Sequence, residues 1–144
     1  MPANTPKGLP YPLPSEPVAE GAQAIRNLAE ALATVEPWHE VGAAGEPGFQ
    51  NFWVNYGAPF ATAGFYRDGA GIVRLKGTIK GGLGGNNEAF GLPVGYRPAA
   101  QQSWRVPSGT DPAANVSVRA DGLVVITTSQ NTGLFLDAVS FRAA

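Results

Sequence analysis

The chain has 144 residues, 44% of them hydrophobic and 15% charged, and its formal net charge is −1. This length predicts one compact domain with an appended segment, and the near-zero charge excludes a global field that would recruit nucleic acid or an anionic membrane. The sequence has no cysteine, which excludes disulfides and a thiol nucleophile, and no apolar run approaches the roughly 18 residues of a bilayer span. We therefore expect no nucleic-acid partner and no membrane insertion.

Residues 1–14 form a proline-rich arm with the sequence MPANTPKGLPYPLP. The prolines exclude a helix and favour an extended, polyproline-II-like chain. Leu9, Tyr11 and Leu13 alternate with these prolines and give the arm regularly spaced apolar positions. Two interpretations stay open here, a disordered arm and a peptide that docks onto a larger assembly.

Residues 15–37 are predicted to form a helix that begins at Ser15, a suitable N-cap, and ends at Pro37. Two rows of residues recur at intervals of seven and make an a/d pattern over about three heptads. We expect this seam to hold the chains of a short parallel bundle through Val18, Ile25, Leu28, Leu32 and Val35. A helix that packs on its own domain would show a similar stripe, and the pattern does not separate a dimer from a trimer.

Residues 38–144 show the alternation with a period of two that is typical of β-strands. We expect strands within residues 51–56, 60–66, 71–80, 115–129 and 133–143. About eight short strands with no helix between them, in a segment rich in glycine and proline, predict an antiparallel β-sandwich or jelly-roll head. The predicted fold class is therefore mainly β, with an N-terminal arm and one helix.

The stretch GFYRDGAGIVRLKGTIKGG, residues 64–82, contains the clearest hairpin signal, Asp68–Gly69, and Asp121–Gly122 gives a second. In the strand expected after the first turn, one face is apolar and should enter the core through Val73, Leu75 and Ile79. The other face is basic and should point outward through Arg74, Lys76 and Lys80. Gly71 is expected to form a bulge or a close backbone approach beside the turn.

The sequence offers little support for enzymatic chemistry. The single histidine, His39, lies at the junction after the helix, where a structural role is the simpler interpretation than a catalytic triad or a metal site. KGGLGGNN at residues 80–87 matches neither a P-loop nor a dinucleotide fingerprint and reads as a loop between strands. No opposed pair of carboxylates suggests glycoside cleavage. We expect a protein that is not an enzyme and needs no cofactor or metal.

Several segments of the sequence are similar to sequences of one protein family. The segment GLPYPLPSEPVAEGAQAIRNLAEAL resembles the N-terminal region of small tail-fibre and minor tail proteins from phages of actinobacteria. The matching helix positions are Pro17, Val18, Ala19, Gly21, Ala22, Ile25, Leu28 and Ala29. Further along, the resemblance includes WHEVGAAGEPGFQNFWVNYG, LFLDAVSFRA and a motif formed by Leu92, Pro93, Gly95, Tyr96, Arg97 and Pro98. It therefore spans nearly the whole chain.

The resemblance implies a homotrimeric virion fibre on the phage particle, and the tail is a more expected location for it than the capsid. The domains would be an arm at 1–14 that attaches to tail or capsid proteins, an oligomerisation helix at 15–37 and a β head at 38–144. Such heads are thought to bind host cell-surface glycan, in particular cell-wall saccharide. The chain lacks a long shaft, so the alternative is a structural decoration or adaptor fibre with no receptor-binding role.

A saccharide site needs an exposed aromatic platform with polar neighbours. Four aromatic residues of the head are candidates for it, Trp53, Tyr56, Tyr66 and Trp104. For each of them the alternative is a place in the core or in a subunit interface.

Overall fold

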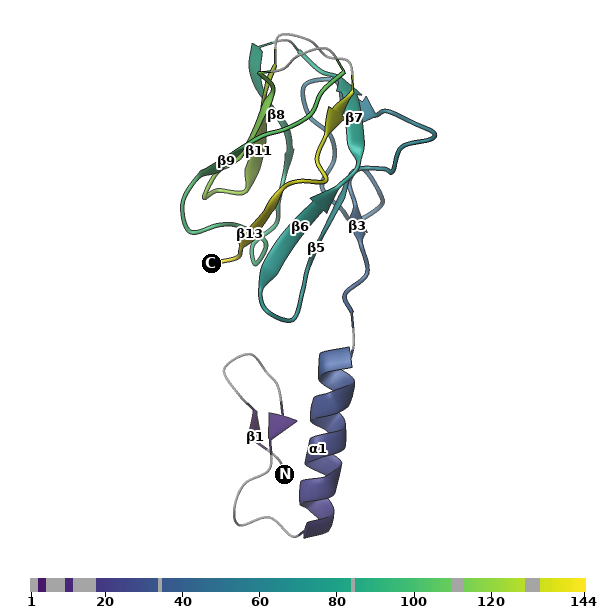
Figure 1. Cartoon of the computed structure of the whole chain (residues 1–144), viewed down its shortest axis with the longest axis vertical. Helices are drawn as coiled ribbons and strands as arrows, with labels where there is room; N and C mark the ends of the chain where they lie inside the picture. The colour runs from purple at the N-terminus through teal and green to yellow at the C-terminus, as the bar shows by residue number, and fades with distance from the viewer. Residues whose placement is uncertain are drawn as a thin grey trace. The chain divides into compact units, whose positions relative to one another are not determined.

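The computed structural model describes residues 3–4, 10–11, 18–33, 35–83, 85–109, 113–128 and 133–144. The chain divides into two compact units, Met1–Glu36 and Pro37–Ala144, whose elements are shown in Figure 1. Among the described helices, none combines the length and the apolar character that crossing a membrane requires. The fold is mainly β, with one N-terminal helix followed by three antiparallel sheets.

The N-terminal unit contains a short strand pair and one helix. Strand β1 (Ala3–Asn4) pairs antiparallel with β2 (Pro10–Tyr11), so this part of the predicted extended arm folds back on itself. Helix α1 (Val18–Ala33) contacts β2 and carries Glu20 in its first turn. An acidic side chain at this position interacts favourably with the positive end of the helix dipole. The predicted N-cap Ser15 and the apolar arm positions Leu9 and Leu13 lie outside the described residues.

The first sheet of the head has four strands in the order β8-β11-β10-β9, all antiparallel. Their bounds are Gly85–Gly91, Leu123–Thr128, Asn115–Val118 and Gln102–Arg105. Strand β7 (Thr78–Gly81) ends and strand β8 begins inside the glycine-rich stretch that we expected to be a loop, so that prediction is wrong for Gly81 and for residues 85–87. Its Asn86 and Asn87 pair with Thr127 and Ile126 of β11, because backbone hydrogen bonding tolerates polar side chains at the end of a sheet.

The other two sheets are built from strands within residues 39–81, and each is joined by one strand from residues 134–142. The order β12-β7-β4 joins Leu134–Phe135, Thr78–Gly81 and Trp53–Asn55. The order β13-β6-β5-β3 joins Ser140–Arg142, Ile72–Lys76, Gly64–Arg67 and His39–Glu40. In Figure 1 the yellow strand β13 lies beside teal β6, far from it in the sequence.

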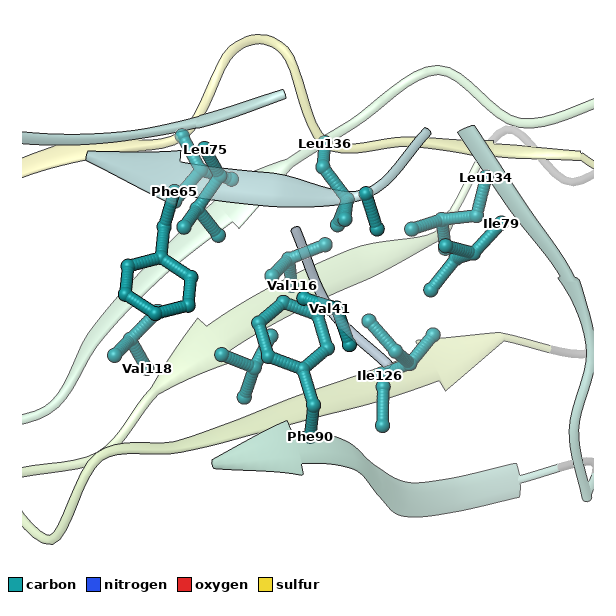
Figure 2. Packing of buried hydrophobic residues seen from close by; sticks show 14 of the residues in the cluster. Val41, Phe65, Leu75, Ile79, Phe90, Val116, Val118, Ile126, Leu134 and Leu136 are labelled. Atoms are coloured by element: carbon teal, nitrogen blue, oxygen red, sulfur yellow. The ribbon is translucent and has the colours of Figure 1, made fainter. Parts of the chain in front are cut away.

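One core holds the three sheets together. Figure 2 shows Phe65 and Leu75, from β5 and β6, and Phe90 and Ile126, from β8 and β11, entering the same cluster. Their side chains are buried, and so is Ile79 of β7, which confirms the predicted core face of residues 73–79. Burying a residue of this size contributes roughly 1.5–3 kcal/mol, so this cluster is the main stabilising feature of the head.

Gly77 divides what we expected to be one strand over residues 71–80. Its φ of 103° favours glycine, and a Cβ there would lie 2.5 Å from the carbonyl oxygen of Thr62. The chain therefore leaves β6 at Lys76 and enters β7, in a different sheet, at Thr78. The expected C-terminal strand over residues 133–143 is divided in the same way, by the turn in which the Val139 amide donates to the Leu136 carbonyl.

The predicted hairpins at Asp68 and Asp121 are present. The turn between β5 and β6 is closed by the Gly71 amide, which donates to the Asp68 carbonyl, and Gly71 has a φ of 86°. Asp68 caps the turn by accepting hydrogen bonds from the amides of Ala70 and Ile72. The glycine at the end of the turn thus supplies the left-handed conformation, while the aspartate acts as an acceptor.

Candidate functional site

The outer face of the sheet β13-β6-β5-β3 carries a row of aromatic and polar side chains. Arg74 of β6 is paired with Tyr66 of β5 on one side and with Ser140 of β13 on the other. Residues of neighbouring strands that pair in register point to the same face, and their sequence neighbours Phe65, Val73 and Phe141 are buried. The row therefore faces away from the core.

Trp38, just before β3, extends this row by one residue. Its ring lies 4.5 Å from the ring of Tyr66, centroid to centroid, at an interplanar angle of 72°. This edge-to-face arrangement is a favourable one for two aromatic rings. Trp38 is 41% exposed, so a large part of the indole meets solvent.

These residues line a pocket of about 290 Å³. Trp38 and Tyr66 form its aromatic wall, Arg74, Lys76, Asp137 and Ser140 its polar part, and Leu75 and Val139 contribute apolar atoms. We call it the Trp38–Tyr66 pocket. A concave site with apolar walls and a few convergent polar groups is the common form of a small-molecule site.

Lys76 orients the aromatic wall. Its Nζ lies 2.7 Å from Oε1 of Glu40 and 5.3 Å from the centroid of the Trp38 ring, so the ammonium is both paired and placed for a cation–π contact. Gly64 permits this arrangement, because a Cβ there would lie 2.9 Å from Cε of Lys76. Burial alone would raise the pKa of the Glu40 carboxyl, but hydrogen bonds from Lys76 and Thr62 outweigh it and lower the pKa below 4.5.

Arg74 stands at the edge of the pocket beside Asp68. Its guanidinium lies 3.5 Å from Oδ2 of Asp68, a long and partly exposed ion pair. The hydrogen bond from the Ile72 amide is the main reason why the pKa of Asp68 lies below its ordinary value, and the Ala70 amide and Arg74 lower that pKa further. Because the pair is long, Asp68 holds the guanidinium loosely and leaves donors directed toward solvent.

Asp137 reaches the pocket because of the turn between β12 and β13. Its Oδ1 accepts a hydrogen bond of 3.0 Å from the Gly77 amide, the residue that divides β6 from β7. The carboxylate is exposed and has further acceptor sites, since an ionised carboxylate offers about four. The two breaks in the predicted strands therefore meet here and place one carboxylate at the pocket.

Of the four predicted platform residues, the structure brings Tyr66 to the pocket and leaves the others elsewhere. Trp53 is 1% exposed, and its Nε1 donates to Oδ1 of Asn87. A buried indole has no face for a sugar, so the prediction of Trp53 as part of an exposed platform is wrong. It points inward because Trp53 and Asn55 occupy the inner face of β4, whereas Val54 is exposed.

Tyr56 and Trp104 lie at other places on the head. Tyr56 belongs to an aromatic cluster with Phe60 and Phe135, and Nζ of Lys80 lies 5.0 Å from its ring centroid. Trp104 is half-buried and lies 6.0 Å from Phe141, centroid to centroid. Neither residue lines the Trp38–Tyr66 pocket, so the four candidates do not form one platform.

Trp38 is the site residue that the sequence reading missed. It follows Pro37, and we took this position as the junction between the helix and the head. The signal that could have found it is the alternation of Trp38 and Glu40, which places both on the face opposite His39.

His39 takes part in a network of its own. Its Nδ1 lies 2.8 Å from Oε1 of Glu46 and its Nε2 lies 3.1 Å from the hydroxyl of Tyr96. The imidazole also stacks on Phe65, with ring centroids 5.0 Å apart. The network joins three segments of the chain beside the core, which matches the structural role expected for His39. Within the described part of the chain, no group of three or more His, Asp or Glu residues is placed to hold a metal ion.

The predicted helix seam is on the surface of its own unit. Its apolar side chains are largely exposed, at 92% for Val18, 62% for Ile25, 62% for Leu32 and 75% for Val35, which follows the end of α1. Leu28 is half-buried, and Ala24 is the fully buried residue of the helix among those described. The stripe is therefore available to another chain.

Comparison of the chain with protein-family models, with curated proteins and with solved structures gave no match.

Proposed function

We propose that the chain is a homotrimeric phage virion fibre protein whose β head attaches the particle to saccharide on the host cell surface. The observation that carries this proposal is the Trp38–Tyr66 pocket, where an aromatic wall and four polar side chains converge on a surface concavity. Aromatic rings attract the C–H groups of a sugar through the negative charge of their faces. The polar side chains supply both donors and acceptors for hydroxyl groups.

The exposed stripe of α1 supports the trimeric part of the proposal. A surface helix with Val18, Ile25 and Leu32 in one row exposes apolar area that a bundle of like helices would bury. In this proposal three helices form a coiled-coil-like bundle, and each β-sandwich or jelly-roll head presents one pocket. Three weak sites on one stem would bind a repetitive surface far more tightly than one site.

The proposal assigns the remaining parts of the chain to the virion. The arm at residues 1–14 would attach to tail or capsid proteins, and the tail is the proposed location. It involves no catalytic step, no cofactor and no nucleic acid.

A decoration or adaptor fibre is the second candidate, and the helix stripe favours it equally, because such a fibre also needs to assemble. It differs in having no ligand in the pocket. Binding to cells therefore separates the two functions.

The test measures binding of the fluorescently labelled full chain to cells of an actinobacterial host, with purified cell-wall polysaccharide as competitor. We expect saturable binding that the polysaccharide inhibits and that Trp38→Ala abolishes. Phe52→Ala is the matched control, because it removes another exposed aromatic side chain, 80% exposed, that does not line the pocket. Folded chain that binds neither cells nor polysaccharide of the host would overturn attachment and favour the decoration fibre.

A further inference from the structure

We propose that the Trp38–Tyr66 pocket takes one neutral pyranose ring, which stacks on the aromatic wall and divides its hydroxyl groups among Asp137, Ser140 and Arg74. This inference rests on the function proposed above and names the class of sugar that the site would recognise.

The size of the pocket limits the ligand. Its volume of about 290 Å³ lies just below the range for small-molecule sites, roughly 300–1,000 Å³. One sugar ring fits such a space, and further rings of a polysaccharide would lie outside it. The neighbours of the bound ring would then meet the exposed face of the sheet.

The aromatic wall favours the flat C–H face of a six-membered ring. Trp38 and Tyr66 stand at 72° to each other, so a sugar that stacks on one ring meets the edge of the other. Lys76 lies over the Trp38 ring and is held there by Glu40, which fixes the indole before any ligand arrives. A fixed wall lowers the entropy lost on binding.

The polar groups match hydroxyls rather than a single charged group. Asp137 is an acceptor, Arg74 is a donor, and the hydroxyl of Ser140 is both. Asp137 stands on the turn after β12, while Arg74 and Ser140 are adjacent on β6 and β13. A ring with hydroxyls on neighbouring carbons can donate to the carboxylate with one and accept from the guanidinium with the next.

The charges at the pocket disfavour an anionic sugar. Arg74 and Lys76 are the lining cations, and both already have carboxylate partners, Asp68 and Glu40. Asp137 adds a third carboxylate, so these residues carry two positive and three negative charges. Arg142 lies two residues further along β13, outside the lining, and its charge brings the net charge of the group to zero. A uronate or a sugar phosphate would bring its charge toward Asp137, and the two lining cations that could receive it are already shared with Asp68 and Glu40.

The experiment follows the amide and indole N–H signals of the ¹⁵N-labelled full chain during titration with pairs of methyl glycosides. Each pair compares a neutral pyranoside with its uronate, such as glucoside with glucuronide and galactoside with galacturonide. We expect at least one neutral pyranoside to shift the Trp38 indole signal and the amides of Tyr66, Arg74 and Ser140. Its uronate should bind at least about threefold more weakly.

Two variants test the roles of the lining residues. Asp137→Asn should weaken binding of the neutral sugar about tenfold, because a hydrogen bond to a charged group is replaced by a hydrogen bond to a neutral one. It should also reduce the difference in affinity between the neutral sugar and its uronate. Trp38→Ala should abolish the shifts at the other lining residues. Phe52→Ala should leave the affinity unchanged, and the dispersion of the amide signals shows for each variant whether the chain is folded.

The outcomes separate this inference from the proposed function. A uronate that binds as tightly as its neutral partner, or more tightly, overturns the inference and leaves attachment to saccharide standing. Binding to host cells without any monosaccharide shift at the pocket overturns the inference as well, and places recognition on another surface. A chain that binds neither sugars nor cells overturns both.

Discussion

The two units of this chain differ in where they keep their apolar side chains. In the β head, Phe65, Val73 and Phe90 are fully buried within one cluster. In the N-terminal unit, Val18, Ile25 and Leu32 of α1 are largely exposed. The head therefore completes its core within one chain, whereas the helix exposes the surface that a second chain would cover. This difference leads us to assign recognition to the head and assembly to the helix.

The largest expected effect on the free energy of unfolding distinguishes the buried apolar residues of the head from the exposed apolar residues of the helix. Phe90→Ala leaves a cavity in the head and should lower its free energy of unfolding by about 3–5 kcal/mol. Ile25→Ala should leave the unfolding of the head unchanged. Tryptophan fluorescence during thermal unfolding is a suitable measurement, because Trp38, Trp53 and Trp104 all belong to the head. Equal losses of unfolding free energy in the two variants would mean that the helix and the head unfold as one unit.

The next largest effect on stability concerns Gly77, which divides β6 from β7 and donates its amide hydrogen to Asp137 at the pocket. Gly77→Ala brings a Cβ within 2.5 Å of the Thr62 carbonyl oxygen at a φ of 103°, so we expect a loss of about 2–4 kcal/mol. Gly69→Ala is the matched control, since a Cβ there meets nothing within 4 Å, and its effect should stay within about 0.5 kcal/mol. Denaturant unfolding of the two variants measures both values. A well-tolerated Gly77→Ala would contradict the role given to this residue.

Assembly is tested by charge on the helix. Ile25→Asp places a carboxylate in the exposed row and should dissociate the proposed trimer, whose mass is expected to be three times that of the 14.9 kDa chain. Gln23→Asp adds the same charge at an exposed helix position outside the seam and should leave the mass unchanged. Sedimentation equilibrium gives the mass of each variant. A wild-type chain that stays monomeric would remove the trimer from the proposal.

The smallest effect is the pH dependence of the head. Glu40 and Asp68 have pKa values below their ordinary 4.5 and 3.8, so the stability that each contributes is fully present above those values and is lost as the pH falls through the folded-state pKa. The melting temperature of the wild type should therefore exceed that of the Glu40→Gln, Asp68→Asn double variant by less at about pH 3 than at about pH 5. Because both carboxyls are partly exposed, the difference in melting temperature should be only about a few °C. A difference that does not change with pH would contradict this account.

The periodicity of the sequence was enough to predict a mainly β fold with one N-terminal helix and much of the core. Val73, Leu75 and Ile79 are buried as their alternation indicates, and both hairpins form at the Asp–Gly pairs. The same alternation continues through Gly77, where the chain changes sheet. It could not show this break, because the cause is a close approach of Gly77 to Thr62 from another part of the chain.

The candidate site was harder to predict for the same reason. Tyr66, Arg74 and Ser140 come together through strand pairing, and Asp137 joins them through a hydrogen bond to Gly77. The sequence analysis named Trp53 as a candidate and left out Trp38, although Trp53 lies on the inner face of its strand and Trp38 is exposed. Which face of a short strand meets the core depends on its register with its neighbours.

The apparent affinity of the full chain for host cells tests the division of roles most directly. We expect wild type and Gln23→Asp to bind alike, and Ile25→Asp to bind at least about tenfold more weakly, because a monomer presents one pocket where the proposed trimer would present three. The head of Ile25→Asp should stay folded, as its tryptophan fluorescence will show. Undiminished binding by a monomeric Ile25→Asp would contradict the account, since the helix would then contribute nothing to attachment.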